Sequence, residues 1–381
     1  MTVDDPFLDE SHRGLQAQVR AFGDQHLRGW AADEQDPAGR TREVVALLAR
    51  AQLLEWAVPP PFGRMDLRGL VSAREGLAYF SGLADTAFAM QGLGSHAVSL
   101  AGSEAQQRRW LPEVVRGQVL CAFAVTEPDA GSDLSAVRTR GERDGSLWRL
   151  TGIKTFISNA GIAGLYTVLA RTAPAPGPQD SRGLSMFLVD ADAPGLAVKP
   201  LEPMAAHPLG EVHFSEAPAV LLGEEGAGYA LALAVLETFR PSVGAAACGL
   251  AARALHEAAR WATARRQFGR PLSDFQAIQM MLADMHAELA AALLVVRQAA
   301  WLRDQGQPRI AKEAAVAKLL ATETAQRVVD RAVQIHGGQG VLRGSTVERL
   351  YREVRGLRIY EGTSEIQRLV IARQLLKELK A

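Results

Sequence analysis

The sequence predicts an α+β protein in which two helical regions flank a central β region. Apolar residues recur at helical spacing from Phe7 to about Gly117. Near Leu120 the chain changes to short runs of β-forming residues separated by Gly, Pro and Asp. From Gly226 onward it returns to long, Ala- and Leu-rich helical patterns. A length of 381 residues suits two or three domains, which we expect over residues 1–118, 119–223 and 224–381.

In the first region, helical spacing links Leu8 to Phe22 and Val44 to Leu54. The run Pro59–Gly63 interrupts this pattern. Residues 67–101 then predict two apolar helices, and Ser103 is a suitable N-cap for a third that ends near Gly117. The first domain is therefore expected to be helical throughout.

The middle region predicts a β-domain that ends near Leu222. Its expected strands cover residues 119–126, 147–151, 165–171, 184–189 and 196–200. The last region predicts an antiparallel helical bundle. Its expected long helices cover residues 229–265, 274–305 and 310–334, followed by a short helix at 347–353 and a last helix after Thr363.

Composition excludes several classes of function. Lys plus Arg equals Asp plus Glu at 42 each, so net charge predicts no attraction to nucleic acid or anionic membrane. No unbroken apolar run approaches the roughly 20 residues of a membrane span, and the acidic N-terminus is not a secretory signal. Cys121 and Cys248 suit small core residues in a reducing compartment. The histidines show no metal-binding spacing, so we expect no metal.

The stretch Arg358–Gln367 carries the strongest chemical signal. Glu361 precedes Gly362 and the N-cap candidate Thr363, so a carboxylate lies just before a helix start. Because Gly362 has no side chain, a ligand could approach the backbone closely there. In a dry environment Glu361 could serve as a general base. On this stretch alone, simple capping of the helix explains the pattern equally well.

Two segments of the middle region suit contact with a planar ligand. In Phe123–Asp133 a strand runs into a turn of small residues, whose backbone N–H groups and hydroxyl could contact polar groups. In Lys154–Asn159, strand alternation places Phe156 and Ser158 on one face. Taken alone, an ordinary β-turn and core packing of Phe156 are the better explanations.

Two further segments lie in the last region. Arg265–Pro271 is a basic helix end, and Gln334–Gly340 is a glycine-rich helix stop. Each is a weak signal by itself. The guanidinium of Arg265 is suited to pairing with phosphate.

These five segments, at their places along a chain that reads as helical, then β, then helical, closely resemble the acyl-CoA dehydrogenase family of flavoproteins. The resemblance covers nearly the whole chain, from about Phe7 to Lys380. It implies an N-terminal helical domain, a middle β-barrel or sandwich domain and a C-terminal four-helix bundle. It also implies FAD as cofactor, a homotetramer built as a dimer of dimers, and a cytoplasmic location.

The resemblance assigns roles to matching residues. Those implied to bind FAD are Val125, Thr126, Gly131, Ser132, Phe156, Ser158, Arg265, Gln267, Phe268, Gln334, Gly338 and Thr363. Glu361 matches the catalytic base, and Arg240, Tyr360 and Gly362 are implied to lie at the substrate. Some relatives carry the base directly before the arginine matched by Arg240. Phe239 occupies that position here and cannot act as a base.

The implied reaction is α,β-desaturation of an acyl-CoA thioester, with electrons passed to an electron-transferring flavoprotein. The alternatives are an oxygen-using oxidase or monooxygenase of the same fold, or a dehydrogenase acting on an acyl-carrier-protein thioester. The helix over residues 84–100 is implied to line the acyl pocket. Its bulky Phe88, Met90 and Leu93, with some space from Gly92 and Gly94, suggest a short or medium acyl chain. Pro60–Asp66 lacks the Gly-Gly pair usual in relatives, which affects the expected pocket entrance.

Overall fold

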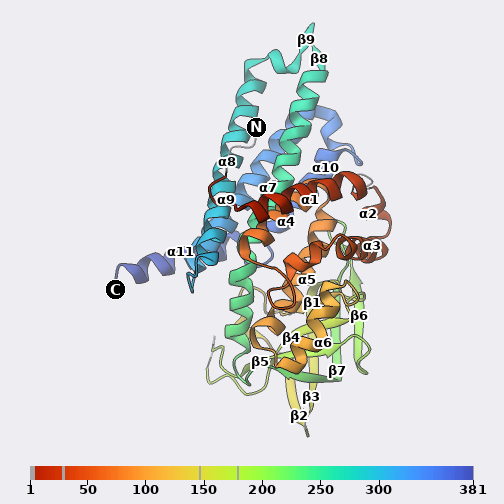
Figure 1. The fold of residues 1–381 in the computed structure, drawn as a ribbon, viewed down its shortest axis with the longest axis vertical. Helices are drawn as coiled ribbons and strands as arrows, with labels where there is room; N and C mark the ends of the chain where they lie inside the picture. Colours follow the sequence, from red (N-terminus) through yellow and green to blue (C-terminus); the bar gives the residue numbers. More distant parts are fainter. Residues whose placement is uncertain (1–4, 28–30, 146, 178–179, 381) are drawn as a thin grey trace. The chain divides into compact units, whose positions relative to one another are not determined.

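The computed structural model describes residues 5–27, 31–145, 147–177 and 180–380, and its elements follow the predicted order (Figure 1). By density of contacts the chain forms two compact units. One contains Met1–Ala31, Asp66–Asp85 and Glu237–Ala381, and the other contains Ala32–Met65 and Thr86–Leu236. The N-terminal helices are thus shared between the units. The domain boundaries at 118/119 and 223/224 stay predictions.

The N-terminal region is helical, as predicted. Its helices are α1 (Glu10–His26), α2 (Ala31–Gln35), α3 (Pro37–Arg50), α4 (Leu67–Phe80), α5 (Gly82–Ala101) and α6 (Glu104–Val115), with a 3-10 turn at Leu53–Ala57. Ser103 caps α6 through a reciprocal capping box with Gln106, which confirms the predicted start of that helix. The two expected apolar helices at 67–101 are α4 and α5.

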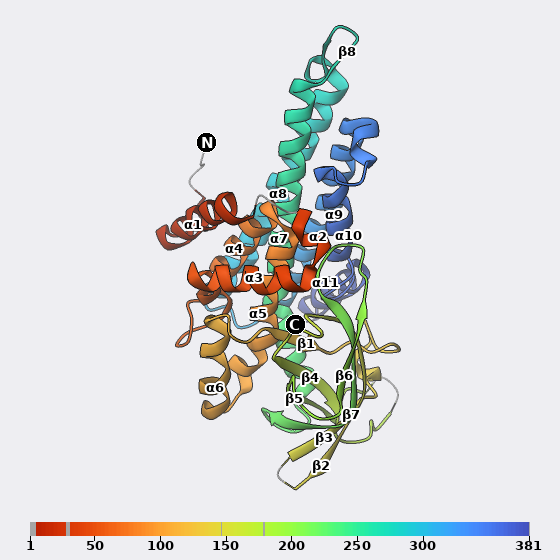
Figure 2. The same cartoon turned by 90° about the vertical axis from the view of Figure 1, so that its right-hand side faces the viewer.

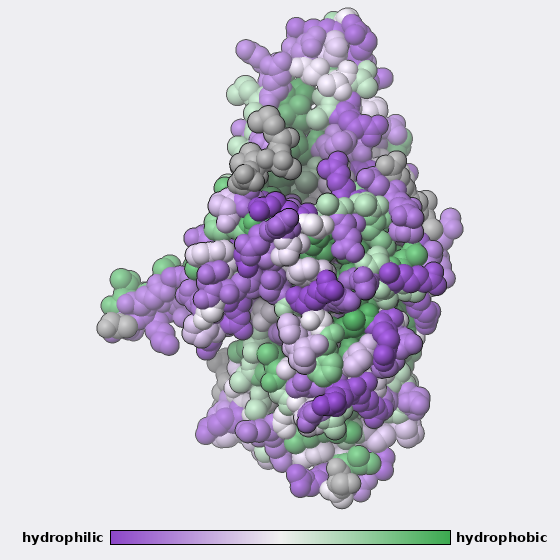
Figure 3. Space-filling model, viewed as in Figure 1, coloured by the Kyte–Doolittle hydropathy of each residue, from purple (hydrophilic) through white to green (hydrophobic). Residues whose placement is uncertain are grey.

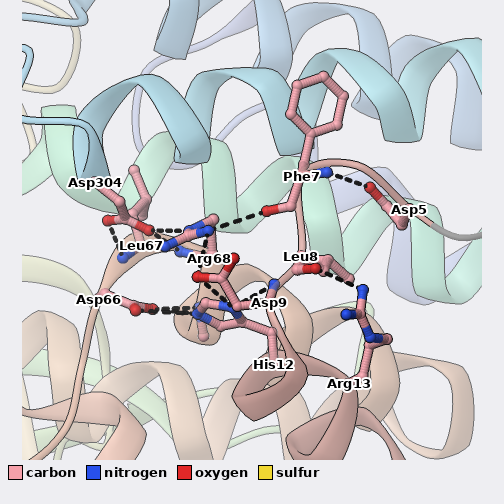
Figure 4. A network of polar contacts seen from close by, with 11 residues as sticks. Asp5, Phe7, Leu8, Asp9, His12, Arg13, Asp66, Leu67, Arg68 and Asp304 are labelled. Carbon is pink, nitrogen blue, oxygen red and sulfur yellow. Dashed lines mark hydrogen bonds and ion pairs between the residues drawn. The ribbon is translucent and has the colours of Figure 1, made fainter.

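A polar network fixes the start of α4 (Figure 4). The Asp66 carboxylate accepts a hydrogen bond from the Gly69 backbone N–H at 2.6 Å and contacts Nε2 of His12 on α1 at 3.0 Å. Asp304 accepts hydrogen bonds from the backbone N–H groups of Leu67 and Arg68 at 2.8 and 3.0 Å. Two carboxylates therefore satisfy the free N–H groups of the first turn, and their charge is favourable at a helix N-terminus.

The middle region is a β-domain, as predicted, but with more strands. They are β1 (Cys121–Ala124), β2 (Arg140–Asp144), β3 (Leu147–Ser158), β4 (Leu165–Arg171), β5 (Leu184–Asp190), β6 (Leu196–Leu201) and β7 (Leu209–Leu222). The sequence prediction missed β2, which is mostly charged, and β7, which Glu216 at φ 53° and Pro218 interrupt. Pairing with neighbours forms these strands, because β-propensity depends strongly on context.

The strands close into a barrel. β4 pairs with β5, β5 with β7, β7 with β3, β3 with β2, and β2 returns to β4 through a single bridge. Such closure leaves few free edges. β1 adds to β4 in parallel, and β6 adds to β7. The register of β3 against β7 shifts between Lys154 and Ile157. This irregularity lies at the segment predicted to face a planar ligand.

The C-terminal region is a helical bundle, and the bounds of its helices lie close to the predicted ones. Its helices are α7 (Gly228–Ala264), α8 (Gln276–Asp304), α9 (Ala311–His336), α10 (Thr346–Leu357) and α11 (Ser364–Glu378). Helix α9 packs against α8, α10 and α11. Strands β8 (Arg266–Gln267) and β9 (Arg270–Pro271) form a hairpin that the sequence prediction missed (Figure 2).

Much apolar surface of the bundle is exposed within this single chain. On α11 the buried residues are the polar Ser364 and Gln367, whereas Leu376 is 58% exposed. Figure 3 shows α11 at the left, mainly hydrophilic with hydrophobic atoms toward its end. By length and composition α7 and α8 could each cross a membrane, which is weak evidence because core helices pass the same test. The apolar window of α7 is 72% buried and that of α8 is 11% buried.

Candidate active site

Glu361 lies in a tight turn between α10 and α11. Its φ is 55°, in the left-handed region that only a few per cent of non-glycine residues adopt. Gly362 follows with φ 93°. Thr363 caps α11, with its hydroxyl accepting a hydrogen bond from the Ile366 backbone N–H at 3.3 Å. The predicted helix start is confirmed. Directly before it, Glu361 and Gly362 both have positive φ angles.

Side chains from three helices hold the carbonyl groups of this turn. Nε of Arg240, on α7, donates to the Glu361 carbonyl at 3.1 Å. Nζ of Lys318, on α9, donates to the Gly362 carbonyl at 2.8 Å. Nε2 of Gln367, on α11, donates to both carbonyls at 3.3 and 2.8 Å. Arg240, which the family resemblance places at the substrate, thus contacts the backbone of the candidate base.

The Glu361 side chain has the surroundings of a general base. The residue is half-buried, and its Oε2 atom is buried without a hydrogen-bond partner among the described residues. Burial raises the pKa of Glu361 above the ordinary value of 4.5, and the positive charges of Arg74, Lys318 and Arg240 oppose this shift. A carboxylate with a raised pKa accepts a proton more readily than one in water.

A buried ion pair lies in the electrostatic surroundings of Glu361. Arg74, on α4, donates through Nε and Nη2 to the two oxygens of Asp85 at 2.8 Å each, and through Nη1 to Ser242 Oγ at 2.8 Å. Arg74 and Asp85 are 2% and 4% exposed. Burial by itself lowers the pKa of Arg74, but Asp85 more than offsets this effect, so the guanidinium stays charged.

Helix α9 also holds the turn on its other side. The Glu323 carboxylate accepts a hydrogen bond from Ser364 Oγ at 2.6 Å and one from Arg358 Nε at 2.9 Å. These contacts lower the pKa of Glu323 despite its partial burial. Phe239, at the position where some relatives carry the base, is fully buried. Tyr360 is 40% exposed and directly precedes the base.

The Phe123–Asp133 segment forms a turn with exposed residues, and buried hydrogen bonds of Glu127 and Lys154 support it. Glu127 is buried and accepts hydrogen bonds from Lys154 Nζ at 2.7 Å and from the Thr139 backbone N–H at 2.9 Å. Lys154 also donates to the Val125 carbonyl at 2.9 Å. The Thr126 carbonyl accepts a hydrogen bond from the backbone N–H of Thr155, the next residue of β3. Burial lowers the pKa of Lys154 to about 8, although Glu127 opposes the shift.

Four of the residues that the resemblance assigns to FAD in the middle region are accessible. Gly131 and Ser132 are exposed, and no atom lies within 4 Å of the position a Gly131 Cβ would take. Phe156 is 66% exposed at φ 56°, and Ser158 is half-buried. Ile157 between them is buried, so the predicted alternation holds for these three residues.

The remaining residues assigned to FAD lie in the C-terminal region. Arg265 and Gln267 are exposed at the β8–β9 hairpin. Phe268 at its tip is 92% exposed with φ 50°, followed by Gly269 at φ 80°. Two consecutive positive φ angles are typical of a two-residue hairpin loop. Gln334 and Gly338, at the end of α9, are exposed as well. These residues are therefore available for contact with a molecule outside this chain.

The helix assigned to the acyl pocket is α5. Phe88, Met90 and Leu93 are all buried. A Cβ on Gly94 would lie 2.5 Å from Cβ of Cys121, so this glycine allows close packing of α5 on β1. The expectation that Gly94 opens space for an acyl chain is wrong, because β1 occupies that space.

Sequence reasoning missed the buried charges of the site. These are Arg74, Asp85, Lys154 and Lys318, together with the partly buried Glu323 and the buried amide of Gln367. A usable signal existed for two of them. Arg74 falls between Leu70 and Leu77 at helical spacing, and Lys318 falls between Ala314 and Ala321. A charged residue on an apolar helical stripe indicates a buried polar contact.

Comparison with known proteins gives the same family as the sequence motifs. Family models describe the acyl-CoA dehydrogenase N-terminal, middle and C-terminal domains, and they match residues 9–118, 122–217 and 226–376. The chain belongs to the acyl-CoA dehydrogenase family. It is thus an oxidoreductase with the three-domain fold of that family, whose members are flavoproteins with FAD as the usual cofactor.

Individual relatives match this chain over almost its whole length. A 3-(aryl)acrylate reductase of Clostridium sporogenes is 37% identical over 385 residues, covering 97% of this chain and 100% of that protein. Butyryl-CoA dehydrogenase of Megasphaera elsdenii has a TM-score of 0.90 at 30% identity, covering 98% of this chain and 100% of that one. A structure described as the electron transferring flavoprotein of Acidaminococcus fermentans has a TM-score of 0.91 at 31% identity, covering 98% and 99%.

The residues assigned to FAD fit that group. Phe156 and Phe268 are exposed aromatic side chains at strained backbone positions, where a flavin or adenine ring could pack. Gly131 and Gly338 leave open space beside the backbone, which allows close approach of a phosphate or ring. Arg265 supplies an exposed guanidinium suited to a diphosphate.

We predict that Asp85→Ala lowers the free energy of unfolding by about 3–5 kcal/mol, because it leaves the buried Arg74 without its counter-charge. Urea denaturation monitored by circular dichroism measures the change. The double variant Arg74→Met with Asp85→Leu removes both charges and is expected to recover much of the loss. Glu104→Ala, which breaks an exposed pair with Arg108, serves as a control with little effect. A double variant no more stable than Asp85→Ala would contradict this account.

Proposed function

We propose that this protein is an FAD-dependent acyl-CoA dehydrogenase that converts an acyl-CoA thioester to the trans-2-enoyl thioester. The observation that carries the proposal is Glu361, whose buried and unpartnered carboxyl oxygen lies in a turn anchored by three helices. A carboxylate held in this way, with a raised pKa, is suited to accepting a proton from a bound substrate.

In the proposed mechanism, Glu361 accepts the α-proton of the thioester. Bound FAD supplies the acceptor for the β-hydrogen and its electron pair. Loss of the α-proton places negative charge on the thioester carbonyl, which a hydrogen-bond donor stabilises. The Glu361 backbone N–H donates no hydrogen bond to any described residue, so it can donate to that oxygen. Arg240, Lys318 and Gln367 hold the turn that carries both groups.

The proposed substrate is a short or medium acyl chain on CoA. The bulky, buried Phe88 and Met90 of α5 support this choice, as does the likeness to a butyryl-CoA dehydrogenase. An acyl-carrier-protein thioester is the alternative carrier. A panel of thioesters scored by flavin bleaching tests the choice, and preference for chains longer than palmitoyl would contradict it.

We also propose an electron-transferring flavoprotein as the electron acceptor, in a cytoplasmic enzyme. The family resemblance supports this choice, as does the likeness to a solved structure whose description names an electron transferring flavoprotein. Steady-state turnover with such a flavoprotein as the only acceptor tests it. Rapid reoxidation of the reduced flavin in air would instead favour an oxidase.

We predict that Glu361→Gln slows anaerobic flavin reduction by a saturating thioester at least about 10²–10⁴-fold, the usual contribution of a general base. Gln has nearly the same shape, so FAD content and thioester affinity should stay close to wild type. Stopped-flow absorbance at the flavin band measures the rate. If Glu361 served only to cap α11, the variant would lose stability and retain its rate. Bleaching at close to the wild-type rate would sink the mechanism.

We predict that the rate of flavin reduction rises with pH through a pKa above 4.5, the ordinary value for Glu. The sign follows from burial, which favours the neutral acid, so a higher pH is needed to form the carboxylate that accepts the proton. The rate constant at saturating substrate, measured across the acidic pH range, gives this rising part of the pH–rate profile, the acidic limb. A limb at or below 4.5, or one retained in Glu361→Gln, would assign it to another group.

We propose a homotetramer, a dimer of dimers, in which FAD binds across a subunit interface. The exposed Arg265 and Phe268 support this arrangement. We predict that Arg265→Ala weakens FAD binding by about 1.5–3 kcal/mol, the contribution of hydrogen bonds to a charged group. FAD retention on dilution, with light scattering for mass, measures it, and Arg343→Ala is an exposed control. A monomer with undiminished FAD affinity would refute the interface.

A further inference from the structure

Lys318 is a buried cation that neither accepts nor donates a proton or hydride in the proposed reaction. It lies on the inner face of α9, where the other buried residues are uncharged: Ala314, Ala315, Ala317, Ala321, Thr322, Thr324, Ala325, Val328, Val329, Ala332 and Ile335. Its side chain is fully buried. A charge removed from water is costly unless it is paired or hydrogen-bonded. Retaining it in a helix of small apolar residues therefore calls for a specific contact.

The contact that Lys318 makes differs from that of Lys154, the other fully buried lysine among the described residues. Lys154, also fully buried, pairs with the carboxylate of Glu127 at 2.7 Å. Lys318 forms no ion pair within 4.0 Å among the described residues and instead donates to the neutral carbonyl of Gly362 at 2.8 Å. Its charge is thus directed at the peptide that follows the candidate base.

The position of this carbonyl decides the shape of the turn. Each peptide unit is planar, so fixing the Gly362 carbonyl also fixes the N–H of Thr363 on the opposite side. Gly362 has φ 93°, and a Cβ there would lie 2.7 Å from Nε2 of Gln367. Glu361 itself is held at φ 55°, a conformation that costs of order 1–3 kcal/mol and persists only when its surroundings impose it.

We propose that Lys318 is a positioning residue for Glu361, acting through its hydrogen bond to the Gly362 carbonyl. The inference deepens the proposed function and rests on it, since it presumes that Glu361 is the base. The ammonium group keeps the Glu361–Gly362 turn in its left-handed form, so the carboxylate and the Glu361 backbone N–H stay in place during proton transfer. Displacement of a catalytic group by about 1 Å can cost 10²-fold in rate.

The surrounding charges set what a change at Lys318 does to the base. The charged groups near Lys318 are Glu361, Arg240, Glu323 and Glu365, and those near Glu361 also include Arg74 and Asp85. Burial lowers the pKa of Lys318 to about 8, and Glu361 opposes that shift. Removing the positive charge makes the Glu361 carboxylate less favourable, so the acidic limb of the rate profile should move to higher pH.

The test compares Lys318→Met with wild-type holoenzyme. Methionine fills a similar volume, and in this variant the Gly362 carbonyl keeps its hydrogen bond from Gln367 Nε2, so it is not left without a donor. We expect flavin reduction by a saturating thioester to slow about 10–100-fold, with the acidic limb shifted upward and FAD content unchanged. Hydrogen exchange measured by mass spectrometry should rise in the peptide covering residues 359–366, whether or not substrate is present. Lys312→Met, on the same helix but bonded to Glu378, is the matched control and should match wild type in all readouts.

The outcomes separate this proposal from the proposed function. If no thioester bleaches the flavin of the wild-type protein, the proposed function fails. Hydrogen exchange in residues 359–366 of Lys318→Met still tests whether Lys318 holds the turn. If wild type is bleached and Glu361→Gln is not, but Lys318→Met keeps the wild-type rate, acidic limb and exchange, Lys318 has no positioning role. Should Lys318→Met not fold, Lys318→Arg, which keeps the charge, must retain the wild-type acidic limb. A shifted limb in that variant would overturn the proposal.

Discussion

The left-handed turn at Glu361 and Gly362 is the constraint on which the site depends. The positive φ of Glu361 is unfavourable for a residue with a side chain, so the turn persists because neighbouring groups satisfy its carbonyls. Arg240, Lys318 and Gln367 supply those hydrogen bonds from α7, α9 and α11. Helices far apart in the sequence therefore converge on two peptide groups. The turn that carries the candidate base is therefore held by three helices of the bundle.

The second requirement is a balance of charge around a half-buried carboxylate. Burial raises the pKa of Glu361, and the nearby cations Arg74, Lys318 and Arg240 oppose that rise. Of these cations, Arg74 is paired with Asp85, whereas Lys318 and Arg240 donate to backbone carbonyls of the turn. The same side chains thus shape the turn and set its electrostatics. Structure and reactivity cannot be altered independently here.

Helical periodicity predicted the long elements of the fold because an amphipathic helix carries its own signal at 3.6 residues per turn. Helices α7, α8 and α9 begin and end within a few residues of the expected positions. The strands were less predictable. β2 is charged and β7 is interrupted, and each forms because a neighbouring strand supplies its hydrogen bonds. The closure of the barrel through β4 and β5 leaves no local mark in the sequence.

For the site, the sequence by itself determined the family, the candidate base Glu361 and the helix start at Thr363. Those features are local, since a carboxylate, a glycine and an N-cap stand next to each other in the chain. Only the tertiary structure decided which side chains support them. Lys318 lies 43 residues before the base, and Arg240 lies 121 residues before the carbonyl it binds. Whether a charged side chain is exposed or buried against a peptide depends on how α7, α9 and α11 pack, because burial is a property of contacts between distant segments.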